Sequence, residues 1–403
     1  MRTCQACERD RAFLTSRLRP PFESGGNRLR VVDLFAGCGG LSLGIALAAR
    51  GRGLAFDVRL AVDADPDAVA VYKANFPNSV VRRASVQALF DGELGSDPSA
   101  VEAAVRASVG EVDVLAGGPP CQGHSDLNNH TRRDDERNAL YAIMARAAEV
   151  LDPSVILVEN VPTAIHDVAD VVGLTRRSLQ DRGYTVEDRV IDLVPLGVPQ
   201  RRRRHVLLGY RGQRRDILAN LRPACPVHTA RTVEWAISDL AESAPDGAMD
   251  RPSRPTPTNA ARMAWLIEHD EHDLPNALRP PCHQSEHSYR SMYGRLRWDQ
   301  PAQTVTTGFG SMGQGRFVHP ATARTITAHE AARLQTIPDF FDFSLARTRG
   351  SLARLIGNAV PPGLPAAILE AVELNSKGLL RLEPVGVAVE GEPREVVAEG
   401  VVW

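Results

Sequence analysis

The stretch Asp33–Leu41, with the sequence DLFAGCGGL, decides the fold class, because an apolar run leads into glycines and then into a helical segment. Val31–Phe35 has the short apolar character of a strand, and Leu41–Ala49 is rich in alanine and leucine, as helices are. Glycines let a backbone pass close to a ligand, and a helix N-terminus supplies N–H groups to it. This order is typical of doubly wound α/β sheets, which bind ligands at the carboxyl ends of their strands.

The alternation of short strands and helices continues along the chain. Strands are predicted at Val58–Val62, Val112–Ala116 and Val155–Val158, and helices at Pro66–Asn75 and Asn138–Leu151. Short apolar strands separated by helices predict a mostly parallel, doubly wound sheet. The fold class is therefore α/β, and a change in composition farther along the chain indicates a second, smaller domain.

The character of the sequence changes after Thr232, and residues 241–285 are rich in Pro, Asp, His and Asn. We expect an N-terminal extension, an arm or a loose segment, over residues 1–28. The main domain is expected over 29–231 and 321–375, where helix returns at Ala328–Gln335 and Leu364–Leu374, and the smaller domain over 232–320. A tail over 376–403 alternates Val with Glu and Gly, which fits an edge hairpin and a frayed end equally.

Charge and cysteine content restrict the function classes. The 403-residue chain has a net charge of −2, so a nucleic-acid surface must come from local basic clusters. Nearly all basic residues are arginines, whose flat bidentate donors suit phosphates and guanine edges. The six cysteines form no evenly spaced disulfide framework, and neither a signal core nor a membrane-length apolar run is evident. We therefore expect a soluble, cytoplasmic protein in which a free thiol persists.

Asp63 ends the second predicted strand. A carboxylate at this position commonly accepts hydrogen bonds from ribose hydroxyls, so Asp63 and the glycine loop together predict a cofactor that carries adenosine. A nicotinamide cofactor is the weaker interpretation, because the spacing Gly-x-Gly-x-x-Gly is not met.

Two reactive groups follow two further strands. Cys121 lies in the sequence Pro119-Pro120-Cys121-Gln122-Gly123, where the prolines stiffen a polar loop at a strand's carboxyl end. Glu159 comes directly after the run Val155–Val158, and partial burial favours the protonated form of such an acid. A lone cysteine is usually an inert small hydrophobe, and a lone acid is usually a helix cap or an ion-pair partner. Their neighbourhood makes them a candidate nucleophile and acid, whereas Cys38 is expected to serve packing or the structure of the cofactor loop.

The densest basic cluster is Gln200-Arg201-Arg202-Arg203-Arg204, which runs into the apolar segment 205–208. Alternate residues of a strand share a face, so Arg202 and Arg204 are expected on one side and Arg201 and Arg203 on the other. Since a buried strand follows, one of these faces is expected to point into the site.

Taken together, these motifs resemble the DNA (cytosine-5) methyltransferase family of the bacterial C5 type, over about Leu29 to Leu374. The resemblance implies a Rossmann-like domain that binds S-adenosyl-L-methionine. It implies cofactor contacts at Phe35, Gly37, Gly39, Gly40, Leu41, Asp63 and Asn358, the last in Gly357-Asn358-Ala359-Val360-Pro361-Pro362. Four further motifs of the family have counterparts in this chain. They are Pro120-Cys121-Gln122, Glu159-Asn160-Val161, the Gln-x-Arg-x-Arg of Gln200, Arg202 and Arg204, and the late motif that begins at Arg324-Thr325-Ile326-Thr327.

The resemblance also implies a mechanism and catalytic residues Cys121, Glu159, Arg202 and Arg204. The Cys121 thiolate adds to C6 of a cytosine rotated out of the duplex, and C5 then accepts the methyl group. Glu159 contacts N3 and the N4 amino group, Arg204 holds O2, and Arg202 braces the loops of Cys121 and Glu159. No dedicated residue for removal of the C5 proton stands out in the sequence, and a water is the candidate. Gly123–Arg137 has the composition of a loop that closes over DNA.

The smaller domain is expected to read the DNA sequence. Arg297, Thr304 and Thr306 lie in segments similar to the family's recognition segments, and arginine and threonine suit guanine edges and thymine methyl groups. One departure concerns the cofactor. The family usually places an Asp after the third strand, where this chain has Arg83-Ala84-Ser85-Val86, so either Ser85 replaces that contact or the contact is lost.

Double-stranded DNA is the expected partner, with a cognate restriction endonuclease as a further one, and the protein is expected to be a monomer. The alternatives are a tRNA cytosine-5 methyltransferase and a non-catalytic DNA-binding homologue; the long stretch between Arg204 and Arg324 favours DNA over tRNA. Cys4-x-x-Cys7 and Cys225-x-x-His228 offer zinc-ligand types, but no spacing rule links the two pairs. We expect unliganded surface cysteines there, and no metal.

Overall fold

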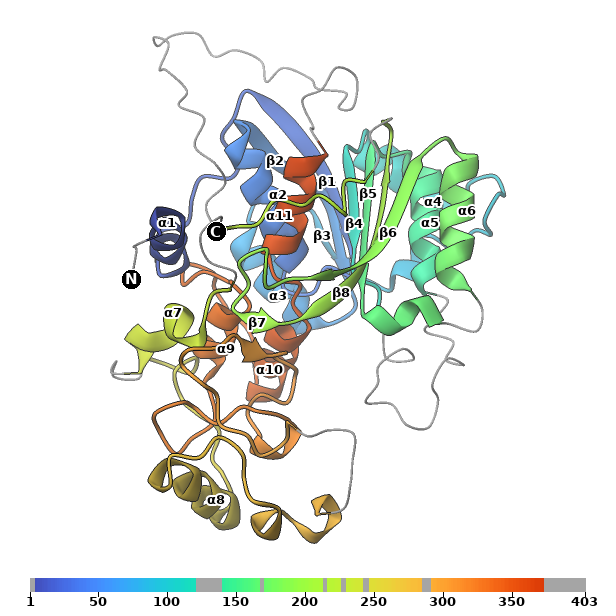
Figure 1. Ribbon diagram of the computed structural model, residues 1–403. Helices are drawn as coiled ribbons and strands as arrows, with labels where there is room; N and C mark the ends of the chain where they lie inside the picture. The colour runs from blue at the N-terminus through green and yellow to red at the C-terminus, as the bar shows by residue number, and fades with distance from the viewer. Residues whose placement is uncertain are drawn as a thin grey trace, which may run out of the picture.

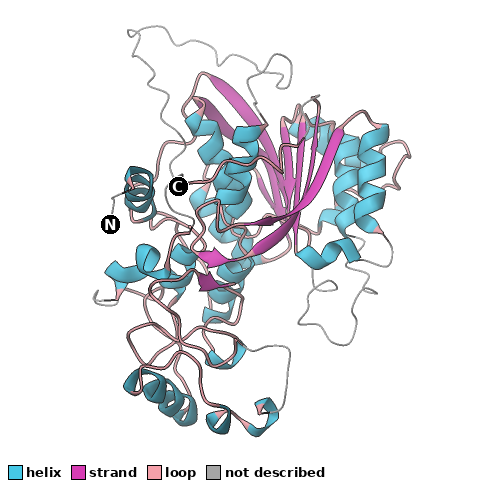
Figure 2. Ribbon diagram, viewed as in Figure 1, coloured by secondary structure: helices cyan, strands magenta, loops and turns pink. Residues whose placement is uncertain are grey.

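Seven strands form one sheet at the centre of the main body (Figures 1 and 2). The structure is a computed structural model that describes residues 4–120, 140–166, 170–212, 216–225, 230–241, 246–284 and 291–372. The strands are β1 (Asn27–Leu34), β2 (Leu54–Asp63), β3 (Val81–Arg83), β4 (Val114–Gly117), β5 (Val155–Asn160), β6 (Thr185–Asp192) and β8 (Arg203–Tyr210). Their order is β3-β2-β1-β4-β5-β8-β6. Two short strands, β7 (Gln200–Arg201) and β9 (Ala302–Gln303), pair in parallel as a second sheet.

Helices cover both faces of the large sheet. One face carries α2 (Gly40–Gly51), α3 (Pro66–Asn75) and α11 (Gly363–Ala371), and the other carries α4 (Ala100–Val109), α5 (Leu140–Leu151) and α6 (Val171–Asp181), as Figure 1 shows. The remaining α-helices of the described ranges are α1 (Gln5–Leu14), α7 (Val233–Ile237), α8 (Pro257–Glu268), α9 (Ala328–Leu334) and α10 (Arg349–Asn358). A large buried hydrophobic cluster lies on each side of the sheet. The predicted doubly wound α/β fold is confirmed.

The direction of the strands places the candidate site. β1 pairs in parallel with β2 and β4, β2 with β3, and β4 with β5, whereas β8 runs antiparallel to both β5 and β6. The prediction of a mostly parallel sheet is therefore confirmed. Because parallel strands share one carboxyl edge, the residues that follow β1, β2, β4 and β5 meet there.

Most predicted elements agree with the structure to within a few residues, and α3 has the predicted bounds. The strand β6 was not predicted. Its sequence TVEDRVID carries four charged residues, and it lies at the edge of the sheet, where only Ile191 is fully buried. An edge strand of this kind lacks the apolar run by which a buried strand is recognised.

The N-terminal segment is not a loose arm over residues 4–28. Leu14 and Phe22 are buried, and Phe22 belongs to the main hydrophobic cluster. Asp10 on α1 forms a buried ion pair with Arg231, and the Asp339 N–H donates to the Leu14 carbonyl at 3.0 Å. The polar composition suggested a solvated segment, but Asp10 and Arg11 of α1 pair with Arg231 and Asp239, far along the chain.

A third, smaller hydrophobic cluster lies apart from the two clusters of the main sheet. It consists of Met263, Leu266, Leu274, Tyr293, Met312 and Val318. This cluster is compatible with the smaller domain predicted over 232–320, whose boundaries remain a prediction. Ala302, Val305 and Phe309 belong instead to the main cluster.

One helical stretch, Arg349–Ala371, is long and apolar enough to cross a membrane by length and composition. It comprises α10 and α11 with the turn between them, and 78% of its apolar window is buried inside the fold. A buried core helix passes the same test of length and composition, so this stretch is weak evidence for a membrane span.

Candidate active site

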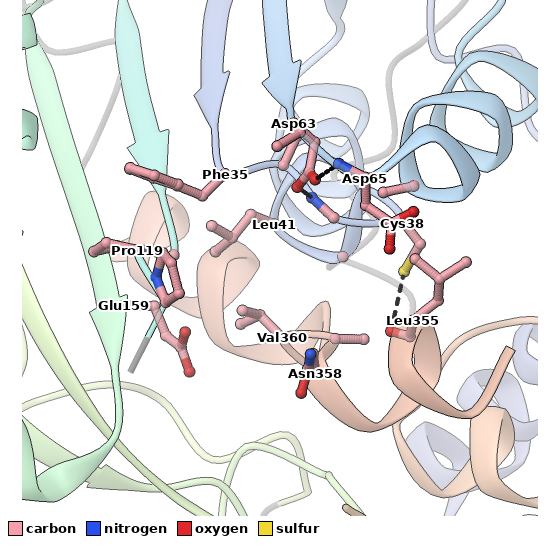
Figure 3. Close-up of a pocket in the computed structure, with 18 of the residues that line it drawn as sticks. Phe35, Cys38, Leu41, Asp63, Asp65, Pro119, Glu159, Leu355, Asn358 and Val360 are labelled. Atoms are coloured by element: carbon pink, nitrogen blue, oxygen red, sulfur yellow. Dashed lines mark hydrogen bonds between the residues drawn. The ribbon is translucent and has the colours of Figure 1, made fainter. Parts of the chain in front are cut away.

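A cavity of about 440 Å³ opens at the carboxyl edge of the parallel strands (Figure 3). Residues from five strand ends and from the turn after α10 line it. Among the predicted site residues, the lining includes Phe35, Gly37, Gly40, Leu41, Asp63, Glu159, Arg202, Arg204 and Asn358. The fold thus brings the predicted cofactor residues and the predicted acid and arginines into one cavity. Cys121 lies outside the described residues, but Pro119 and Pro120, which precede it, line the same cavity.

The glycine loop has two positions at which only glycine fits. Gly39 adopts a φ of 100°, and a Cβ atom there would lie 2.6 Å from the Phe76 ring. Gly39 is not among the residues that line the cavity, and its geometry gives it a role in shaping the loop. Its direct contact with the cofactor stays a prediction. A Cβ atom on Gly40 would lie 2.4 Å from the carbonyl oxygen of Val360. Gly40 therefore lets the turn after α10 close against the start of α2.

We expect Gly40→Ala to lower the free energy of unfolding by about 1–3 kcal/mol, because the methyl group meets backbone that cannot rotate away. Gly26→Ala is the matched control, since a Cβ atom there would meet nothing within 4 Å. Denaturant unfolding of both variants measures the effect. Equal stability of the two variants would contradict the close approach of Gly40 and Val360.

The Asp63 carboxylate joins two loops at the cavity wall. It accepts hydrogen bonds from the Gly37 N–H at 2.9 Å and from the Asp65 N–H at 2.8 Å (Figure 3). Burial raises the pKa of Asp63. The predicted contact of Asp63 with ribose remains a prediction, and the carboxylate also has this structural role.

Behind the glycine loop, Asp33 is a fully buried acid at the end of β1. Its Oδ2 accepts a hydrogen bond from the Ser42 hydroxyl at 2.6 Å, and Oδ1 has no hydrogen-bond partner among the described residues. Burial raises the pKa of Asp33 to about 8. An acid with a raised pKa in the folded state stabilises the fold below its unfolded pKa, and this contribution is lost as the pH rises through the folded value.

We therefore expect Asp33→Asn to gain stability relative to the parent protein as the pH rises from about 4 to about 8. The gain should grow by up to about 1.4 kcal/mol per pH unit, because the amide has no proton to lose. Urea unfolding at several pH values measures it, with Asp299→Asn, at an exposed position, as the control. Parallel stability curves for the Asp33 variant and the parent protein would contradict the raised pKa.

Glu159 and Arg204 form the opposite wall of the cavity. Glu159 is 7% exposed, and its Oε1 pairs with Arg204 Nε at 2.7 Å. A Cβ atom built on Gly118 would lie 3.4 Å from Glu159 Oε2. The loop that leads to Cys121 thus runs directly past the acid. The Asn160 side chain donates to the Pro119 carbonyl at 3.4 Å and accepts from the Val161 N–H at 2.8 Å, which ties the two loops together.

Burial of the arginine cluster alternates as predicted. Arg201 and Arg203 are exposed, whereas Arg202 is buried and lines the cavity with Arg204. Arg202 was predicted to brace the loops of Cys121 and Glu159. Among the described residues, it donates to the carbonyls of Val305 at 2.9 Å, Ala359 at 3.1 Å and Gly357 at 3.4 Å. Arg202 therefore holds the end of α10, which carries Asn358, against the segment after β9. The bracing of the Cys121 loop stays a prediction, because Cys121 lies outside the described residues.

Ser85 and Cys38 were singled out from the sequence, whereas Gln87 and Leu355, which also line the cavity, were not. Ser85 and Gln87 line the cavity after β3, and the Ser85 hydroxyl hydrogen-bonds to the Gln87 side chain. Ser85 thus lies in the cavity after the third strand, where the family usually has an Asp, and Gln87 offers a second polar group beside it. Leu355 and Val360 contribute apolar surface from α10 and the turn after it. Cys38 is buried, its thiol donates to the Leu355 carbonyl at 3.6 Å, and burial raises its pKa to about 12, which agrees with a packing role.

The predicted DNA-reading residues lie outside this cavity. Arg297 is exposed. The Thr304 hydroxyl donates to the Arg201 carbonyl at 2.7 Å, and the Thr306 hydroxyl accepts from the Gly308 N–H at 3.3 Å. Both threonines therefore shape the backbone beside Val305, and their contact with DNA remains a prediction.

Comparison with known proteins gives one family model and several relatives that match most of the chain. The C-5 cytosine-specific DNA methylase family matches residues 29–373. The chain is 42% identical over 358 residues to Type II methyltransferase M1.BsuMI of Bacillus subtilis (strain 168), covering 88% of this chain and 83% of that protein. It is 30% identical over 373 residues to Type II methylase M.HgiDII of Herpetosiphon aurantiacus, covering 89% of this chain and 99% of that protein.

A solved structure agrees in fold. A prophage-encoded Escherichia coli protein, described as a DNA modification methyltransferase, superimposes with a TM-score of 0.59 at 25% identity, covering 85% of this chain and 98% of that chain. The family match spans both walls of the cavity, from the glycine loop to the turn after α10. The chain belongs to the C-5 cytosine-specific DNA methylase family and is a DNA cytosine methyltransferase.

Proposed function

We propose that the protein transfers a methyl group from S-adenosyl-L-methionine to C5 of a cytosine rotated out of double-stranded DNA, through a covalent bond between Cys121 and C6. The observation that carries this proposal is the single cavity with two different walls. One wall is the glycine loop with Asp63 and the turn after α10, and the other is Glu159, Arg204 and the two prolines before Cys121. A methyl donor and a cytosine that share this cavity would meet within it.

The first wall fits S-adenosyl-L-methionine. A Cβ atom on Gly37 would meet nothing within 4 Å, so the loop leaves open space at the N-terminus of α2. Asp63 suits ribose hydroxyls, and Phe35, Leu41 and Val360 offer apolar surface to adenine (Figure 3). Asn358 and the backbone of the glycine loop suit the polar methionine end. When bound, S-adenosyl-L-methionine supplies an electrophilic methyl group on its sulfonium sulfur.

The second wall supplies the groups that activate the cytosine ring. C5 of cytosine is a poor nucleophile, and addition of the Cys121 thiolate to C6 makes C5 electron-rich. Glu159 contacts N3 and accepts from the N4 amino group, and a proton shared with N3 draws electrons from the ring during addition. Arg204 binds O2 and fixes the base in register. Loss of the C5 proton to water then restores the ring and releases Cys121.

The ion pair between Glu159 and Arg204 has a consequence for base binding. Both groups are assigned to the cytosine edge, yet they pair with each other at 2.7 Å. An entering cytosine must therefore replace this ion pair with its own N3, N4 and O2 contacts. A base without the matching edge leaves a buried charge without its partner, which favours cytosine over other bases.

The Type II relatives support a role in restriction and modification, in which methylation protects DNA from a cognate endonuclease. Bacterial DNA lies in the cytoplasm, so the protein is proposed to act there. We also propose that the protein acts as a monomer.

Mapping of 5-methylcytosine tests the proposed function. The protein is expressed in a host without cytosine-5 methylation, and the host DNA is sequenced after bisulfite conversion. We expect methylation of C5 at one recurring short sequence. Purified protein with labelled methyl donor should modify duplex DNA and leave tRNA unmodified. Methylation of tRNA alone, or of an exocyclic nitrogen, would overturn the proposal.

A further inference from the structure

Three cysteines from distant parts of the chain meet outside the catalytic cavity. The Sγ atoms of Cys4, Cys7 and Cys225 all lie within 4.8 Å of one another, and those of Cys4 and Cys225 are 2.9 Å apart. None of the three is joined in a disulfide. Cys4 is the residue before α1, Cys7 lies in its first turn, and Cys225 is 221 residues from Cys4. None of them lines the cavity, so they have no direct part in methyl transfer.

The expectation of unliganded surface cysteines is wrong for two of these residues. Cys4 and Cys225 are each 8% exposed, and Cys7 is half-buried. Their position is also fixed by neighbouring contacts. The Trp235 ring N–H donates to the Cys7 carbonyl at 3.1 Å, and the Arg231 guanidinium lies 4.4 Å from the centre of the Trp235 ring. The thiols are therefore held in a packed environment and do not meet by chance at a mobile surface.

We propose that Cys4, Cys7 and Cys225 bind one structural zinc ion. Zinc prefers tetrahedral sites with thiolate ligands, and the pair Cys4-x-x-Cys7 has the spacing that such sites use. A Zn–S distance of about 2.3 Å puts tetrahedral sulfur atoms about 3.8 Å apart, so small shifts of side chains already within 4.8 Å form the site.

The proposal rests on the three thiols alone. Within the described ranges, no fourth His, Cys, Asp or Glu donor joins the group. His228, which the sequence pairs with Cys225, lies outside the described residues. A site with three thiolates and one remaining position still has a set of soft ligands that hard ions such as Mg²⁺ or Ca²⁺ do not favour.

The ion fastens the N-terminal helix to the segment before α7. Around the same junction, Arg11 donates to the Trp235 carbonyl at 3.0 Å, and the buried pair of Asp10 and Arg231 crosses the interface. A metal bond that closes so long a loop restricts the unfolded chain strongly. Zinc at this position stabilises the packing of α1 without touching DNA or cofactor.

Metal content of the purified full-length protein tests the proposal. The protein is prepared without a histidine tag or chelator, and its zinc is measured by plasma mass spectrometry. We expect about one zinc per chain. Cys4→Ser, Cys7→Ser and Cys225→Ser should each lose most of it. Cys282→Ser, at an exposed cysteine outside the cluster, is the matched control and should retain it.

A second measurement uses the parent protein, so it tests the proposal even if the cysteine variants fail to fold. Cobalt replaces zinc in the parent protein, and thiolate ligation gives an intense near-ultraviolet charge-transfer band. Removal of zinc by a chelator should lower the melting temperature, and added zinc should restore it, while the Cys282 variant behaves as the parent does. Parent protein without stoichiometric zinc would overturn the proposal. So would a disulfide between Cys4 and Cys225 in folded protein, detected by mass spectrometry.

Discussion

Cys121→Ser should abolish methyl transfer and leave DNA binding in place. A serine hydroxyl is far less ionised than a thiol near neutral pH, and it is a much weaker nucleophile toward C6. We expect the single-turnover rate to fall by at least about 10³-fold. Labelled methyl transfer at saturating DNA and cofactor measures the rate, and filter binding over a range of salt concentrations measures DNA affinity.

Cys282→Ser is the control for this experiment, because Cys282 is exposed and lies outside the cavity. A duplex with 5-fluorocytosine at the target gives a direct test of the covalent step, since the C–F bond blocks the loss of the C5 proton. The parent protein should remain bound to this duplex under denaturing conditions, and the Cys121 variant should not. Unchanged activity of Cys121→Ser would rule out the covalent mechanism.

The parts of the site that the sequence predicted correctly are local. Asp63 and Glu159 each follow a run of buried apolar residues, and the end of a parallel strand is a known place for ligand contacts. The alternation of Arg201 to Arg204 likewise follows from strand geometry. These features depend on neighbours in the sequence, so one sequence suffices to predict them.

The parts that the sequence did not predict depend on contacts between distant residues. Arg202 was recognised as important, but its partners Val305 and Ala359 lie more than one hundred residues away. The packing of α1 rests on Asp10 and Arg231, and the cysteine cluster joins residues 221 positions apart. No periodicity or spacing rule reports such pairs. The family match begins at residue 29, so the resemblance could not supply the contacts of Cys4, Cys7 and Asp10.

Glu159→Gln should lower the rate of methyl transfer by about 10²–10⁴-fold while the affinity for DNA stays nearly constant. The glutamine amide has the same shape, and it can still donate to N3 and accept from the N4 amino group. It cannot release a proton to the ring, and it cannot pair as an anion with Arg204, 2.7 Å away in the parent protein. The variant thereby separates the contribution of Glu159 to binding of the base from its contribution to activation of the base.

Comparison of kcat with KM decides between the two roles of Glu159. A fall in kcat at unchanged KM for DNA assigns Glu159 to proton donation, since the hydrogen bonds of recognition remain. Glu268→Gln, at an exposed position on α8, is the control and should match the parent. Melting curves must show that the variant is folded, because loss of one partner of a buried ion pair destabilises a protein. A folded Glu159→Gln variant with the parent's kcat would mean that cytosine is activated without a proton from this acid, and Arg204 at O2 would then be the remaining described group able to polarise the ring.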